Sequence, residues 1–110
     1  MRVIFEHDPN PETSYLEQDE FRERREAYGR DEWFLIGCRV EADVVIAPET
    51  VMQTLRSSGL NGIESDSEQD ELDEIAHQEW MRLRDVLKAV GVSTEQLPLE
   101  VDREWVEWRV

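Results

Sequence analysis

The residues best suited to chemistry are two histidines, one cysteine and a dense run of acids. His7 and His77 are far apart in the sequence, and Cys38 lies within an apolar segment. A zinc site needs grouped Cys and His ligands, and a nucleophile needs a base beside it. The sequence shows neither grouping, so we expect no catalytic residue, no metal site, no cofactor and no enzymatic activity.

The acidic run is the strongest chemical feature. Residues 60–79 contain eight acids and no lysine or arginine, in a chain with a formal net charge of −15. Alternate acids over residues 64–70 resemble a calcium loop but lack its central glycine, so calcium binding is the minor alternative. On a helix, carboxylates three or four positions apart lie about 5–6 Å from one another. This spacing is broadly similar to the phosphate spacing of about 3.4 Å along a DNA strand.

Such a patch repels itself, which favours a functional use for it. We therefore predict that it binds a partner protein, with two tryptophans of the C-terminal tail as apolar anchors. The candidate partner-binding residues are Glu64, Asp66, Glu68, Asp70, Glu71, Asp73, Glu74, Trp105 and Trp108. The alternative left open is a helix start that is rich in acids only for dipole and solubility reasons.

A long helix must carry most of this patch. Apolar residues recur at helical spacing, interrupted by Glu79, and predict a helix over about residues 67–90. Its predicted core stripe is Leu72, Ile75, Ala76, Leu83, Val86, Leu87 and Val90. Ser67 with Asp70, or Ser65 with Glu68, fits a capping box at its start. Gly91 is placed to end it, with Val92 closing a Schellman-type contact.

Strands precede this helix. Residues 2–6 and 33–46 alternate between apolar and polar side chains, and residues 51–56 are expected to return antiparallel after a short connection at 47–50. Gly37 marks a bulge or a close approach within the long strand. Gly59 and Gly62 predict a tight corner with positive φ over residues 57–63.

A second helix is expected over about residues 15–28, capped by Thr13 or Ser14 and ended by Gly29. Residues 99–110 fit either a helix or a strand, and a final strand is favoured because Trp and Val favour sheets. The predicted fold is α+β, with a small, mainly antiparallel sheet of three or four strands packed against the long acidic helix. All 110 residues are expected to form a single domain.

The composition of the chain limits the kinds of binding partner and the cellular compartment that we expect. The negative charge disfavours direct binding to nucleic acid or an anionic membrane and favours a basic protein surface. Cys38 is the sole cysteine, which predicts a buried thiol and no internal disulfide. The sequence contains no apolar stretch of about 20 residues and no secretory signal pattern. A cytoplasmic location is therefore expected.

The segment GLNGIESDS, at residues 59–67, and the acidic helix after it resemble a motif of small acidic proteins of bacteriophages and mobile elements. The resemblance covers about residues 32–92, including the strand WFLIGCRVEADVVI. It implies a mobile-DNA setting, in which small acidic proteins often antagonise host machinery such as CRISPR or restriction enzymes.

Two function classes follow, with a third ranked lowest. The first is a non-catalytic inhibitor of anti-CRISPR or anti-restriction type, whose acids mimic nucleic acid and block a basic nucleic-acid-binding surface. The second is a structural or regulatory subunit, acting as a homodimer or on a phage protein, whose acids only solvate the surface. A calcium-binding module or a small enzyme is the third.

Overall fold

The computed structural model describes residues 1–46 and 51–110, and it has the predicted α+β fold. The strands are β1 (Arg2–His7), β2 (Leu35–Ile46), β3 (Val51–Arg56), β4 (Leu60–Glu64) and β5 (Val106–Arg109). The α-helices are α1 (Arg22–Gly29) and α2 (Gln69–Ala89), and short 3₁₀ turns cover Ser14–Glu17, Asp19–Phe21, Thr94–Gln96 and Arg103–Trp105. The connection predicted at residues 47–50 lies outside the described residues.

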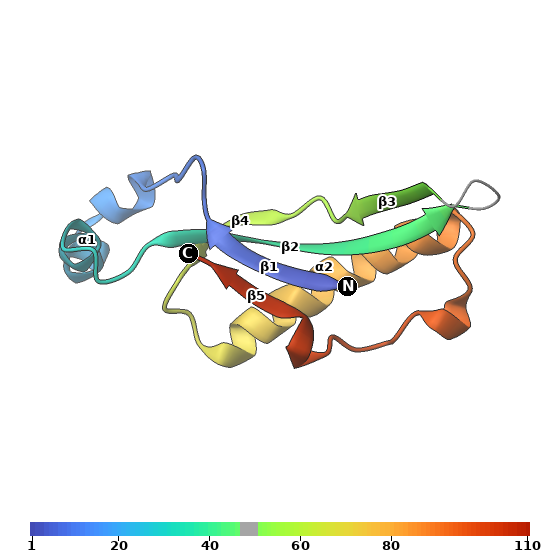
Figure 1. Cartoon of the computed structure of the whole chain (residues 1–110). Coiled ribbons are helices and arrows are strands. Elements are labelled where there is room, and N and C mark those ends of the chain that lie inside the picture. Colours follow the sequence, from blue (N-terminus) through green and yellow to red (C-terminus); the bar gives the residue numbers. More distant parts are fainter. Residues whose placement is uncertain (47–50) are drawn as a thin grey trace.

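Strand β2 is the centre of the sheet (Figure 1). β1 pairs antiparallel along one edge of β2, and β3 and β4 pair antiparallel with β2 one after the other along its second edge. The C-terminal strand β5 is parallel to β1 and closes that side of the sheet. Helix α2 lies under one face of this sheet, and the favoured final strand is present over residues 106–109.

The described residues form five strands, where three or four were predicted. The additional strand is β4, which falls in the predicted corner. Gly59 and Gly62 do adopt the expected positive φ, +84° and +77°. The pairing of β4 shifts register between Ile36 and Cys38. Gly37 is the close approach that was predicted, because a Cβ there would overlap the side-chain oxygen of Asn61.

The start of α2 differs from the prediction. Its N-cap is Glu68, whose side chain makes no capping hydrogen bond, so neither predicted capping box forms. The two serines serve the turn before the helix instead. Ser67 donates to the Glu64 carbonyl at 2.6 Å, and Ser65 Oγ accepts the Phe34 N–H at 2.9 Å.

The end of α2 is as predicted. Gly91 has a φ of +99°, its N–H donates to the Lys88 carbonyl at 3.1 Å, and the Val92 N–H donates to the Leu87 carbonyl at 2.9 Å. These are the two hydrogen bonds of a Schellman motif.

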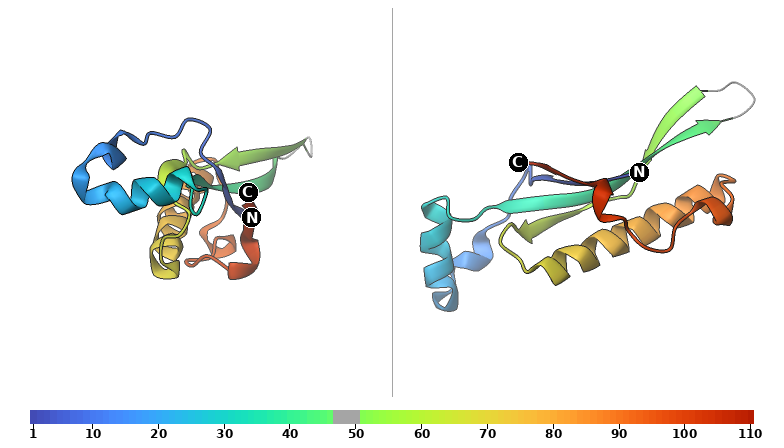
Figure 2. Two further views of the ribbon diagram at one scale, coloured as in Figure 1. Left: turned by 90° about the vertical axis from the view of Figure 1, so that its left-hand side faces the viewer. Right: turned by 60° about the horizontal axis from the view of Figure 1, so that its bottom comes forward.

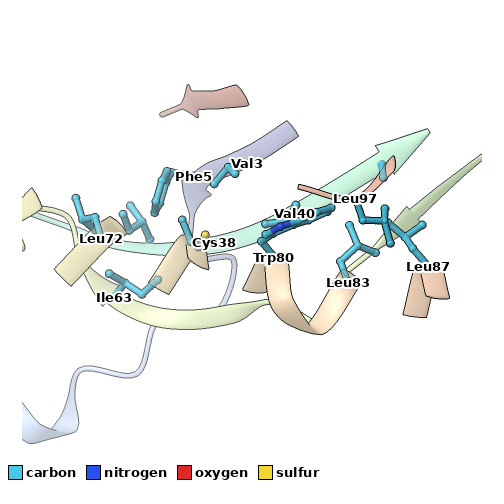
Figure 3. Packing of buried hydrophobic residues seen from close by; sticks show 13 residues of the cluster. Val3, Phe5, Cys38, Val40, Ile63, Leu72, Trp80, Leu83, Leu87 and Leu97 are labelled. Carbon is cyan, nitrogen blue, oxygen red and sulfur yellow. The ribbon is translucent and has the colours of Figure 1, made fainter. Parts of the chain in front are cut away.

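The buried face of α2 is rotated from the predicted stripe. Trp80 is fully buried, whereas Val86 and Val90 are 44% and 59% exposed. The large indole therefore shifts the centre of the packed face toward itself. Figure 3 shows Trp80, Leu83 and other α2 side chains packed with β-strand residues. The buried α2 residues are Leu72, Ala76, Glu79, Trp80, Leu83, Arg84 and Leu87.

Glu79 interrupts the stripe because it has a buried partner, Ser57, and an exposed one, Arg82. The residue is only 1% exposed; it accepts a hydrogen bond from the Ser57 hydroxyl at 3.1 Å and one from Arg82 at 2.8 Å. Ser57 Oγ also accepts the Val40 N–H at 3.0 Å. One hydroxyl thus links β2 to α2. Burial, followed by the nearby Glu79 carboxylate, raises the pKa of the Cys38 thiol to about 12, consistent with the predicted core thiol.

The predicted helix over residues 15–28 is α-helical only from Arg22. Thr13 starts a 3₁₀ turn but makes no side-chain cap, and Gln18 is extended and breaks the element. This break lets Leu16 be buried beside Trp33 and Leu35 in a small second core, against which Tyr15, Phe21, Ala27 and Tyr28 pack. The N-terminal segment thus forms an arm at one end of the sheet (Figure 1).

Replacing Ser57 with alanine tests the link between sheet and helix. Ser57→Ala leaves a buried carboxylate oxygen without its donor, so we expect the free energy of unfolding to fall by about 1–3 kcal/mol. The neighbouring exposed Ser58→Ala is the matched control and should change it by less than about 0.5 kcal/mol. Urea unfolding followed by tryptophan fluorescence measures both. Equal effects of the two substitutions would contradict the assigned role of the Ser57 hydroxyl.

Candidate protein-interaction surface

A groove of about 360 Å³ runs between the first turns of α2 and the C-terminal tail. One wall is aromatic: the Phe5 and Trp108 rings stack with centroids 4.5 Å apart and an interplanar angle of 15°. Trp108 is 46% exposed, so its indole is available to a ligand in the groove. The groove is lined by Phe5, Gln69, Asp70, Leu72, Asp73, Glu74, Ala76, His77, Glu100, Val101, Arg103, Val106 and Trp108.

The opposite wall is acidic. Asp70, Asp73 and Glu74 lie on α2 and face the groove, joined by Glu100 from the tail. Asp73 forms an ion pair with the exposed Arg103 at 3.5 Å, which offsets part of its charge. The side-chain amides of Gln69 and Gln78 donate to Asp73 and Glu74, at 2.8 and 3.1 Å. Glu68 and Glu71 are exposed on the same turns but do not line the groove.

The two predicted tryptophan anchors are placed differently. Trp108 lines the groove, whereas Trp105 is half-buried and packs edge-on against Trp80, with centroids 5.5 Å apart. The indole N–H of Trp80 donates to the Pro98 carbonyl at 2.9 Å. Trp80 therefore fixes the tail at two points, Pro98 and Trp105, and so positions β5 and Trp108 beside the acidic turns.

Glu64 and Asp66 are separated from the other predicted site residues. Glu64 ends β4 and Asp66 lies in the turn before α2, so neither is on the helix. Arg24 of α1 donates to both oxygens of Asp66 at 2.6 and 2.8 Å and to Glu64 at 3.1 Å. This guanidinium holds the pKa of the Asp66 carboxyl below its ordinary value. The predicted patch is thus divided into a neutralised turn and an unneutralised helix start.

Arg24 is itself held in place by aromatic residues. Its guanidinium lies 4.2 Å from the ring centre of Trp33, and the Trp33 indole N–H donates to the Arg24 carbonyl at 2.9 Å. Tyr15 donates its hydroxyl to Glu64 at 3.0 Å; burial, then this carboxylate, raises the pKa of Tyr15 to about 12. These contacts dock the N-terminal arm on the β4–α2 turn.

Sequence reasoning missed Phe5, His77 and Arg103 as groove residues and Arg24 as the cation that divides the patch. The stacking of Phe5 on Trp108 depends on the parallel pairing of β1 with β5, which places the two residues side by side. For Arg24, the one signal in the sequence was that three arginines stand among the acids of residues 20–26, which could have indicated a contact with an acidic segment.

Within residues 1–46 and 51–110, the structure contains no cluster of three His, Cys, Asp or Glu side chains arranged to hold a metal ion. In the same residues, no helix has the length and apolar character needed to cross a bilayer. Comparisons of the chain with protein-family models, curated proteins and solved structures gave no match.

Removing the Arg24 guanidinium tests the divided patch. The lowered pKa of Asp66 means that this ion pair stabilises the fold above the ordinary Asp pKa of about 3.9 and loses that effect as the pH falls through the lowered value. Arg24→Gln should therefore lower stability at neutral pH by about 1 kcal/mol, a modest figure because the pair is partly exposed. The deficit relative to wild type should shrink in acid, where only the contact of Arg24 with Trp33 still contributes.

The matched control is Arg22→Gln, which removes an exposed i,i+4 pair with Glu26 on the same helix. We expect it to change stability by less than about 0.5 kcal/mol at any pH. Thermal unfolding across a pH series measures both variants. A deficit of Arg24→Gln that persists unchanged below the pKa of Asp66 would contradict the role given to that pair.

Proposed function

We propose that this protein is a non-catalytic binding protein that docks its groove on a basic, nucleic-acid-binding surface of a partner and blocks that surface. The observation that supports the proposal is the meeting of unneutralised carboxylates and a half-exposed indole in one groove. Asp70 and Glu74 supply charge there, and Trp108 supplies an apolar face. Surfaces that bind nucleic acid present lysine and arginine, which match this combination.

A lysine or arginine side chain entering the groove gains from both walls. Its cation can lie over the Trp108 ring, an interaction worth about 0.5–1 kcal/mol at an exposed site and about 2 when water is excluded. Its charge is then close to Asp70 and Glu74, while its aliphatic stem lies against Val106. The pairing is specific because an acidic or neutral side chain gains neither interaction.

The length of the acidic surface limits how much of a nucleic-acid strand it can mimic. The helical acids run from Glu68 to Glu74, a rise of about 9 Å at 1.5 Å per residue. This length corresponds to about three phosphates of a nucleic-acid strand. Because Arg24 neutralises the acids before the helix, the surface is too short to replace a long duplex. The protein therefore blocks a local basic pocket, and Trp108 supplies part of the affinity.

The biological setting in this proposal comes from the resemblance of residues 32–92 to small acidic proteins of bacteriophages and mobile elements. A partner in that setting is a host defence complex that must bind nucleic acid to act, as a CRISPR or restriction complex does. Occupying its basic surface inhibits it without any chemical step, in the bacterial cytoplasm where such complexes act.

Charge reversal tests the docking surface. In a pull-down from nuclease-treated host lysate, we expect the wild type to capture a nucleic-acid-binding complex that rising salt releases, because salt screens exposed charges over about 8 Å at 0.15 M. The variant with the groove acids Asp70, Asp73 and Glu74 changed to Lys should capture none of it.

The control variant changes Asp19, Glu20 and Glu23 to Lys. These acids are exposed on the N-terminal arm, so the change in net charge is the same at a different place. This variant should capture the same complex as the wild type. Capture by both variants alike, or capture that salt does not weaken, contradicts the proposal.

Removing the indole separates the apolar from the ionic contribution. Trp108→Ala should weaken binding to the captured complex by about tenfold, from the loss of roughly 1–2 kcal/mol of stacking and contact. Its salt dependence should match that of the wild type, because no charge is removed. Leu99→Ala, at an exposed apolar position outside the groove, is the control and should leave affinity unchanged. Surface plasmon resonance at several salt concentrations measures these affinities.

A further inference from the structure

Strand β3 is a sheet edge that lacks the usual protection against pairing with another strand. It lies at the end of the sheet order, so one of its two edges carries no neighbouring strand among the described residues. Its sequence is VMQTLR, with no acid, no proline and a single charge at its last residue, Arg56. An exposed edge of this kind presents free backbone donors and acceptors to another chain.

The neighbouring edges differ from β3. On the far side of the sheet, β5 has four residues, and two of them, Glu107 and Arg109, form an ion pair at 2.8 Å. Along the same side as β3, strand β4 contains Gly62 with positive φ, and the N–H of Gly62 is already bonded to the Asp8 carboxylate at 3.0 Å. Charge, shortness and irregular backbone are the features that blunt an edge. β3 has none of them over Met52–Leu55.

An apolar pair lies beside this edge on the sheet face away from α2. Val45 and Met52 are directly opposed across β2 and β3, and they are 61% and 66% exposed. Their neighbours Val44 and Leu55 pack against the core, and side chains alternate between faces, so this pair points to the open face. The far halves of β2 and β3 also extend away from α2 (Figure 2).

We propose that β3 pairs antiparallel with β3 of a second copy of this chain about a two-fold axis. Antiparallel pairing of a strand with its own copy is self-complementary, which is the requirement of a two-fold interface. The charge distribution favours this edge: each copy meets the other on an acid-free strand, near the end of α2. The acidic start of α2 lies toward the opposite end of the molecule (Figure 1). Val45 and Met52 of both copies then lie on the same open face beside the new ladder.

The geometry restricts the register. Directly opposed residues of an antiparallel ladder share a face, and a two-fold axis between antiparallel strands is perpendicular to the sheet. A residue of β3 must therefore lie opposite its own copy. The two central candidates are Gln53, which would pair Met52 with Thr54, and Thr54, which would pair Gln53 with Leu55.

The dimer has a consequence for the groove. Pairing through β3 joins two sheets into one and leaves both grooves uncovered toward its two ends, because the groove lies between α2 and β5 on the other side of each sheet. A partner with repeated basic sites would then be held at two points, which raises avidity without a new contact.

The mass of the full chain in solution tests the proposal. Sedimentation equilibrium over a wide dilution series should give a dimer for the wild type. Met52→Lys should give a monomer in either register, even though it lowers the net negative charge. With Gln53 on the axis the new lysine lies near its own copy, and with Thr54 on the axis it lies opposite Arg56 of the second copy, so like charges meet in both cases. Leu99→Lys, at another exposed apolar position, is the matched control and should remain a dimer. Circular dichroism checks that each variant is folded.

Cysteine scanning then tests the register. Gln53→Cys or Thr54→Cys should form a disulfide with its own copy on mild oxidation, and the residue on the axis should react most completely. Native Cys38 does not interfere because it is buried. A wild type that is monomeric at every concentration overturns the proposal, and this includes the case in which β3 accepts a strand of a different protein. A dimer that Met52→Lys leaves intact, with no crosslink at either position, overturns it as well.

Discussion

The packing of α2 against β2 is the interaction on which the rest of the structure depends. Trp80, Leu83 and Leu87 fill the space under the sheet, and the Ser57 hydroxyl joins the β2 backbone to the buried carboxylate of Glu79. With that face fixed, the acids of the first turns are directed to the groove and to solvent. The Trp80 indole also anchors the tail, so the same side chain that fills the core positions β5.

The distribution of charge on this molecule depends on Arg24 as much as on the acids. Arg24 neutralises the β4–α2 turn and is supported by Trp33, while the helix start keeps most of its charge. Acid-rich helices repel themselves, and here Arg24 on the side of the arm and Arg103 beside Asp73 reduce the repulsion. Asp70 and Glu74 supply the charge beside Trp108. The edge strand β3 contains no acid, and it lies far from the groove.

Local sequence patterns were sufficient to predict those helices and strands whose structure depends on residues close together in the chain. Alternation predicted β1 and β2, the short connection after β2 predicted β3 as the antiparallel return, and Gly91 with Val92 predicted the end of α2. The sequence could not show β4, because Asn61 and Gly62 favour a turn and only pairing with β2 makes the segment a strand. It did not show that Ser65 accepts the Phe34 N–H, that Glu79 has a buried donor in Ser57, or that Arg24 reaches Asp66, since each partner is distant in sequence. The acids of α2 could be predicted from the sequence, but the groove could not, because its other residues come from β1 and the C-terminal tail.

The most direct test of the central claim is a nuclear magnetic resonance titration of the labelled protein with a short peptide of arginine, lysine and one leucine. A groove that recognises a basic side chain predicts shifts concentrated at residues 70–74, at Val106 and at the Trp108 indole N–H. The signals of Asp19, Glu20 and Glu23, equally acidic and exposed on the arm, should stay nearly still. Shifts spread evenly over all exposed acids, with an unmoved Trp108 indole, would contradict the account and leave the acids as a solvated surface.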